Sequence, residues 1–178
     1  LVACHELQRR GHHRPDCDAV DPDVHYYQGA AWYRILLPIE NPYHLGRTLL
    51  HFEGAGQKTE VYVYTTKVGS HVGGYDEWTV DITDAVEEFK KTDAFYKKFD
   101  KKIPVVVRCD NSRDVQMIPS DLSDFNLYGG IYRYLNLVYV PTLSIDKVYV
   151  TPKMVDSRKA TVHVKTNFYN PLRIKPGE

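Results

Sequence analysis

The stretch DFNLYGGIYR, residues 124–133, places an acid and an amide just before a double glycine. An ionised carboxylate such as that of Asp124 accepts hydrogen bonds from hydroxyl groups at up to about four lone-pair positions. Gly129 and Gly130 permit a close approach of the backbone. Arg133 is expected to turn inside and pair with a carboxylate. The stretch thus predicts a loop that presents an acid, although Asp124 could instead only cap the turn.

Other site chemistries have less support in the sequence. Two cysteines and three histidines crowd the first segment, but their spacing fits no common structural-zinc pattern, so we predict no metal site. No Gly-x-Ser-x-Gly motif of a nucleophile elbow occurs. The stretch GSHVGGYD lacks the Lys-Ser/Thr of a phosphate loop and is expected to connect two strands. We predict no cofactor and no catalytic residue in this chain.

Composition limits the partners. The 23 basic and 23 acidic side chains of the 178-residue chain cancel, which weighs against nucleic acid as a partner. No apolar run is long enough to cross a bilayer, so no membrane partner is predicted. Three cysteines are an odd number and suggest no disulfide framework. Cys109 is predicted to be a small buried apolar residue.

Short runs of alternating apolar and polar residues, separated by Gly, Asp, Asn and Pro, predict an all-β sandwich. The predicted strands cover residues 32–39, 47–54, 60–64, 77–82, 103–109 and 131–140. Residues 103–109 lack alternation, as expected of a central strand covered on both faces. Trp32 and Trp78 fall inside predicted strands, where packing in the core is the expected role.

Two segments depart from this pattern. Residues 85–99 carry apolar side chains at a loose helical spacing, which predicts a short helical insertion capped by Thr83 or Asp84. After Pro141, two further strands are expected to be joined by a turn at residues 156–157. Two strands cannot bury a core by themselves. They are therefore expected to open a second β-domain, so that the chain would be a fragment of a longer protein.

Five motifs occur in order and at close spacing: YYQGAAWYR, RTLLHFEGAGQKTEVYV, KVGSHVGGYDEWTVDITD, VVVRCDNS and DFNLYGGIYRYLNLV. Together they resemble the N-terminal sugar-binding domain of glycoside hydrolase family 2, which includes β-galactosidases, β-glucuronidases and β-mannosidases. The resemblance covers roughly residues 21–141. From Thr142 the chain resembles the first strands of the immunoglobulin-like domain that follows. The expected domains are an atypical segment at 1–20, the sugar-binding domain at 21–141 and an incomplete immunoglobulin-like domain at 142–178.

The resemblance implies a jelly-roll (galactose-binding-like) β-sandwich whose loops rim the active site of a (β/α)8 barrel. The two catalytic glutamates would lie in that barrel, outside this chain, so the fragment is expected to be inactive. Asp124, with Asn126 beside it, would reach the bound sugar. The parent would hydrolyse terminal β-linked sugars with retention, a β-galactosidase being the first expectation. The alternative is a self-contained carbohydrate-binding module.

The resemblance also bears on partners and location. The expected partners are a β-linked glycan and the missing barrel, and unpaired edge strands at 142–170 would allow a homo-oligomer. Polysaccharide-degrading relatives are often periplasmic or secreted, which favours such a location here.

Three features depart from the family pattern. Tyr64-Thr65 stands where Asn-Gly is usual, so a type I′ turn is not expected and Tyr64 could be presented to a ligand or partner. The helical insertion is longer than the family's usual connection. Residues 1–20 do not resemble the usual start, which suggests a frame-shifted or foreign segment.

Overall fold

The computed structural model describes residues 28–118 and 128–175. The atypical first segment and the candidate residues Asp124 and Asn126 lie outside the described residues. The chain divides into two compact units, one of residues 1–40 and 49–138 and the other of residues 41–48 and 139–178. The expected domain boundaries at 20/21 and 141/142 stay predictions.

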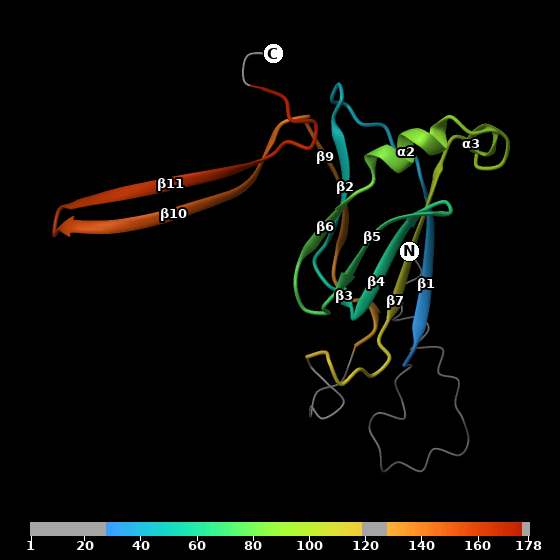
Figure 1. Cartoon of the computed structure of the whole chain (residues 1–178), viewed down its shortest axis with the longest axis horizontal. Coiled ribbons are helices and arrows are strands. Elements are labelled where there is room, and N and C mark those ends of the chain that lie inside the picture. Colours follow the sequence, from blue (N-terminus) through green and yellow to red (C-terminus); the bar gives the residue numbers. More distant parts are fainter. Residues whose placement is uncertain (1–27, 119–127, 176–178) are drawn as a thin grey trace, which may run out of the picture. The chain divides into compact units, whose positions relative to one another are not determined.

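The larger sheet of the first unit has four antiparallel strands in the order β1-β7-β4-β5 (Figure 1). Their bounds are β1 Ala30–Leu37, β7 Ile103–Asp110, β4 Lys58–Val63 and β5 Thr66–Val72. The strand predicted to be central, β7, lies between β1 and β4. It is not fully covered on both faces as predicted, because Val106, Arg108 and Asp110 are only partly buried. Strand β5 was not predicted, and it includes the first residues of the stretch expected to be a loop, GSHVGGYD.

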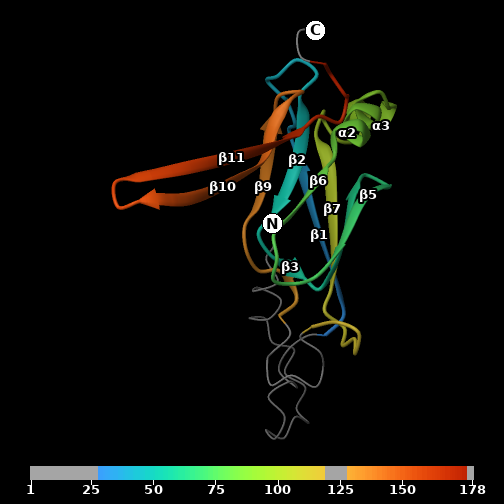
Figure 2. The ribbon, with the colours of Figure 1, turned by 60° about the vertical axis from the view of Figure 1, so that its left-hand side comes forward.

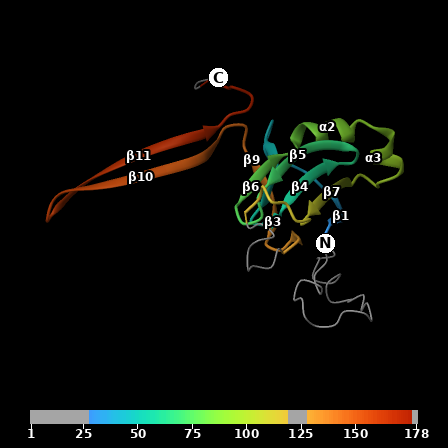
Figure 3. The same ribbon diagram turned by 60° about the horizontal axis from the view of Figure 1, so that its bottom comes forward.

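A second sheet has the order β6-β2-β9, and a two-stranded pair joins β3 to β8. Their bounds are β6 Trp78–Asp81, β2 Arg47–Phe52, β9 Leu135–Val140, β3 Ala55–Gly56 and β8 Gly130–Ile131. Residues 131–140, predicted to be one strand, are thus divided between β8 and β9. Figure 3 shows the strands of the first unit from the end at which β3 lies.

The core of the first unit lies between the two sheets. Buried apolar side chains include Leu50, Phe52, Val61, Val63, Ile103, Val105 and Val107. A cavity of about 160 Å³ is lined by residues of β1 and β7 on one side and of β2 and β9 on the other. Cys109 is a buried cysteine, as predicted. The all-β sandwich is confirmed.

One tryptophan contradicts the predicted core. Trp78 stacks on Phe52 with 4.3 Å between ring centroids and is partly buried, as expected. Trp32, however, is 60% exposed, whereas its neighbour Tyr33 is buried. Trp32 shares its strand face with Arg34, whose guanidinium needs solvent or a charged partner, and this face is therefore the outer one.

The helical insertion consists of α2 Thr83–Lys90 and α3 Asp93–Lys97. Neither predicted cap is correct for α2, because Ile82 is its N-cap and Thr83 is its first helical residue. The Asp81 carboxylate accepts hydrogen bonds from the backbone and the hydroxyl of Thr83 instead. Among the described residues, no helix is long and apolar enough to cross a membrane.

The hairpin between β4 and β5 has a two-residue loop, Tyr64-Thr65, because Val63 pairs with Thr66. Only Tyr64 has a positive φ (55°), which excludes a type I′ turn, as predicted. The Tyr64 ring lies 5.1 Å from Phe89 and 5.6 Å from Phe99 between centroids. Tyr64 therefore holds the helical insertion in place, and the strained backbone is compensated by this aromatic packing.

The second unit contains a long antiparallel hairpin, β10 Ser144–Asp156 with β11 Lys159–Tyr169 (Figure 2). Cross-strand partners share a face of the pair. One face carries the pairs Val148–Thr166, Val150–Val164, Pro152–Val162 and Met154–Ala160. The other carries Lys147–Asn167, Tyr149–Lys165, Thr151–His163 and Lys153–Thr161. The hairpin is thus apolar on one face and polar on the other.

Candidate functional site

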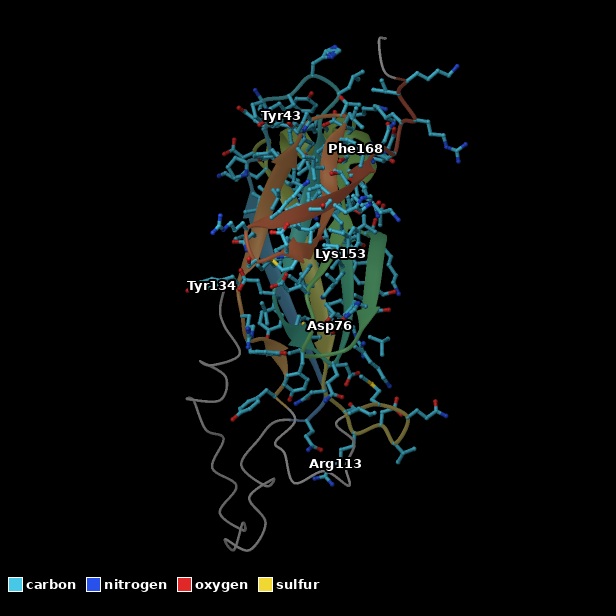
Figure 4. The ribbon with its side chains drawn as sticks, turned by 90° about the vertical axis from the view of Figure 1, so that its left-hand side faces the viewer. Tyr43, Asp76, Arg113, Tyr134, Lys153 and Phe168 are labelled. Carbon is cyan, nitrogen blue, oxygen red and sulfur yellow. The ribbon has the colours of Figure 1, made fainter. Side chains whose placement is uncertain are left out.

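The described residues nearest in sequence to Asp124 and Asn126 are the segment after β7 and the segment that opens β8. Asp76 and Arg113 lie toward the same end of the first unit (Figure 4). The residues that flank 119–127 define the geometry of this end of the sandwich. The roles of Asp124 and Asn126 stay predictions.

The double glycine permits close backbone packing, as predicted. Gly130 has a positive φ (81°) and pairs with Gly56 of β3. A Cβ atom on Gly129 would lie 2.6 Å from Nδ2 of Asn111. No residue other than glycine fits at position 129 without displacing Asn111.

Asn111 is a positioning residue that sequence reasoning did not single out. It is only 2% exposed, and its Oδ1 accepts a hydrogen bond of 2.8 Å from the backbone N–H of Gly29. Asn111 thus ties the start of β1 to the end of β7 and also supports Gly129. The stretch VVVRCDNS contains it, but its partners are too far away in sequence for a local pattern to reveal them.

Three tyrosines gather near the double glycine. The rings of Tyr75 and Tyr132 lie 6.0 Å apart between centroids, and Tyr75 and Tyr128 are exposed. Burial raises the pKa of Tyr75 and of Tyr132, and a second tyrosine beside each adds to the effect. Both hydroxyls stay protonated at neutral pH. That of Tyr132 is buried, whereas the exposed Tyr75 can donate a hydrogen bond to a polar ligand.

Gln57 lies behind these tyrosines and is 1% exposed. Its backbone N–H donates to Asp110, and its carbonyl accepts from Gly73, which fixes the glycine loop before Tyr75. Neither atom of its side-chain amide has a hydrogen-bond partner within the described residues. Beyond it, His71 contacts Asp76 at 3.0 Å and stacks on Trp78.

Arg133 does not take the expected position. Its side chain is exposed, and within residues 28–118 and 128–175 it forms no ion pair with a carboxylate. Its backbone N–H donates to Gly54, at 3.4 Å. The expectation of an inward-turned arginine is therefore wrong, because β8 ends at Ile131 and the chain bends before β9.

Two carboxylates fix the segment that follows β7. Asp110 accepts from Arg108 at 2.7 Å and from the backbone of Ser112, while Asp114 accepts from Lys58 and from the backbone of Gln116. Burial raises the pKa of Asp110, but the bonds from Ser112 and Arg108 outweigh it and hold this pKa below its ordinary value. The Lys58 ammonium lowers the pKa of Asp114.

These shifts predict that the first unit loses stability in acid. A pKa lowered by folding stabilises the folded state above the unfolded pKa, and this contribution is lost as the pH falls through the folded pKa. The free energy of unfolding should therefore fall from about pH 5 downward. Asp110→Asn should be less stable than the parent at pH 7, and the difference should shrink toward pH 3. Urea titrations across this range measure both, and a pH-independent difference would contradict the assignment.

Among the described residues, no group of three His, Cys, Asp or Glu side chains could hold a metal ion. What this end of the sandwich offers is hydrogen-bond donors, ring faces and a close-packed glycine turn. Such groups suit the recognition of a polar, hydroxyl-bearing ligand.

A scan against protein-family models finds no match. The chain is 59% identical to the β-glucuronidase of Parabacteroides merdae over 88% of this chain and 20% of that one, with a TM-score of 0.81. It is 58% identical to β-glucuronidase 3 of Bacteroides uniformis, over 86% of this chain and 20% of that one, with a TM-score of 0.79. A β-galactosidase of Thermoanaerobacter pseudethanolicus is 34% identical over 134 residues, which are 74% of this chain and 17% of the relative.

The chain belongs to glycoside hydrolase family 2. It spans between 16% and 21% of the length of the first curated relatives that it matches. It corresponds to a partial, N-terminal segment of such enzymes. As a family 2 segment, it carries the predicted jelly-roll fold.

Proposed function

We propose that this chain is the non-catalytic sugar-binding domain of a retaining β-glycosidase, with its loops on the rim of the active site of a separate barrel. The observation that carries the proposal is the identity of 58–59% to two β-glucuronidases over most of the chain. That identity favours a terminal β-glucuronide as the substrate over the β-galactoside that was first expected. The β-galactosidase of Thermoanaerobacter pseudethanolicus is only 34% identical.

In this proposal Asp124 accepts hydrogen bonds from hydroxyl groups of the bound sugar, and Asn126 shares the contact. The close contact between Gly129 and Asn111 holds the segment that follows them. Tyr75 lies at the same glycine turn with its side chain exposed, and its protonated hydroxyl supplies further polar surface. Catalytic acid and nucleophile are supplied by the barrel.

A chimera tests the proposal. This chain replaces the corresponding segment of the P. merdae β-glucuronidase, and kcat/KM is measured with an aryl β-glucuronide and an aryl β-galactoside. The chimera should cleave the glucuronide preferentially. Asp124→Ala should lower kcat/KM about 10- to 100-fold, because a hydrogen bond to a charged group contributes about 1.5–3 kcal/mol.

Asp146→Ala is the matched control, since it removes an exposed carboxylate from β10. Equal kcat/KM values for Asp124→Ala and the unmutated chimera would refute the role of Asp124. A chimera that folds but prefers the galactoside would refute the choice of substrate.

We also propose that the isolated chain self-associates through the apolar face of the β10–β11 hairpin. Val150 and Val164, paired at the middle of that face, are both more than half exposed. If two such faces packed together, the valine side chains would be removed from water. Burial of apolar surface is favourable by about 25 cal/mol per Å² of accessible area. Two strands alone are marginally stable, so a partner surface is expected.

Light scattering over a range of concentrations measures this association. The parent chain should form a dimer that dissociates on dilution. Val150→Lys should be monomeric, because it places a charge in the apolar face. Thr151→Lys, on the opposite face, should dimerise as the parent does. A parent chain that is monomeric at every concentration contradicts the proposal.

A further inference from the structure

The outer face of the four-stranded sheet carries an exposed aromatic and charged surface. Antiparallel pairing sets its side chains in rows across the strands. Trp32 of β1 lies opposite Arg108 of β7, which lies opposite Glu60 of β4. In the next row Arg34 lies opposite Val106, which lies opposite Tyr62. Five of these six side chains are aromatic or charged.

Trp32 is the centre of this surface. Its ring is 60% exposed and lies 6.0 Å from the ring of Tyr62 between centroids, with 37° between the planes. The guanidinium carbon of Arg108 lies 5.9 Å from the centroid of the Trp32 ring, within the range of a cation–π contact. The indole therefore has two neighbours, Tyr62 and Arg108, and more than half of its surface is left to solvent.

A network of ion pairs and hydrogen bonds holds the surroundings of Trp32 rigid. Glu60 accepts from the Tyr62 hydroxyl at 3.0 Å and from the Lys67 ammonium. Arg108 donates to Asp110 at 2.7 Å and lies 3.8 Å from Glu60. Because these side chains are already ordered, a ligand that docks here loses little additional conformational entropy.

Arg34 is a second cation of this face. It follows Trp32 by two residues on the same side of β1 and is exposed. Within the described residues, no carboxylate lies within 4.0 Å of its guanidinium. An exposed arginine next to an exposed indole is suited to a ligand that combines a flat apolar face with a carboxylate.

We propose that this face binds a β-linked glycan that carries a uronic acid, with the pyranose ring stacked on Trp32 and the carboxylate paired with Arg34. Tyr62 and Arg108 extend the surface. The ligand class rests on the proposed function, since a β-glucuronide contains the same sugar. Trp32 and Arg34 lie within a strand, whereas the proposed role of Asp124 depends on a different part of the chain. The site on this face and the sugar contact of Asp124 can therefore be refuted independently of each other.

The test uses the whole chain with Trp78→Phe, which leaves Trp32 as its single tryptophan. Its fluorescence is followed during titration with a β-linked disaccharide ending in glucuronic acid, and with the same disaccharide ending in glucose. The acidic disaccharide should give a saturable change in the millimolar range. The neutral one should bind at least about 10-fold more weakly, because it lacks the carboxylate that pairs with Arg34.

Variants assign the contacts, with binding measured by calorimetry. Trp32→Ala should abolish binding and Trp32→Phe should restore part of it. Arg34→Gln should remove the preference for the acidic sugar, whereas Lys147→Gln, an exposed lysine of β10, should not. Trp32→Ala tests the site proposed here, whereas Asp124→Ala tests the sugar contact of the proposed function. The proposal is overturned if neither disaccharide binds the folded chain, or if binding is lost with Asp124→Ala and kept with Trp32→Ala.

Discussion

Phe52→Ala is expected to lower the free energy of unfolding of the first unit by about 3–5 kcal/mol. The Phe52 ring is fully buried and stacks on Trp78 with 4° between the ring planes. Removing it leaves a cavity between the two sheets and takes away the stacking partner of Trp78. Strand β2 is paired with β6 on one side and with β9 on the other, so its backbone cannot move to fill the space.

Urea unfolding followed by circular dichroism and by tryptophan fluorescence measures this loss, since both tryptophans belong to the first unit. Tyr134→Ala is the control, because Tyr134 belongs to the same unit and is 75% exposed. Its effect should stay within about 0.5 kcal/mol. A loss below 1 kcal/mol for Phe52→Ala would mean that the core rearranges around the missing ring.

The sandwich could be predicted because alternation is a local property of the sequence. Val61 and Val63 are buried, and Tyr62 lies on the outer face, as the alternation of residues 60–64 predicts. Alternation assigns residues to two faces but does not say which face is inside. For β1 the charge of Arg34 decides it. Trp32 shares a face with Arg34 and is therefore exposed, although its position within a strand predicted packing in the core.

The supports of the candidate site could not be predicted because they join distant parts of the chain. Asn111 bonds to Gly29, 82 residues away, and Gln57 bonds to Asp110 through its backbone. Neither contact leaves a periodic signal. The double glycine could be recognised in the sequence, since glycine indicates a close approach of the backbone. The sequence did not indicate that Asn111 is the residue that it approaches.

Gly129→Ala is expected to destabilise the first unit by about 1–3 kcal/mol, because the new methyl group overpacks a closed space. It would lie 2.6 Å from Nδ2 and 3.1 Å from Cβ of Asn111. Asn111 cannot move into solvent, so it must turn and give up its bond to Gly29. In the chimera, kcat/KM should also fall about 10-fold or more, since small displacements of ligand-contacting groups are costly.

A double-mutant cycle separates the clash from a general loss of fold. Asn111→Ala removes the bond to Gly29 and should cost about 1–3 kcal/mol by itself. Combined with Gly129→Ala it should cost less than the sum, with a coupling of at least about 0.5 kcal/mol, because the clashing amide is gone. Gly74→Ala is the matched glycine control, since its Cβ would approach no atom closer than 3.4 Å. Additive effects at 111 and 129 would mean that the two residues do not meet, and the close approach at the double glycine would then have another cause.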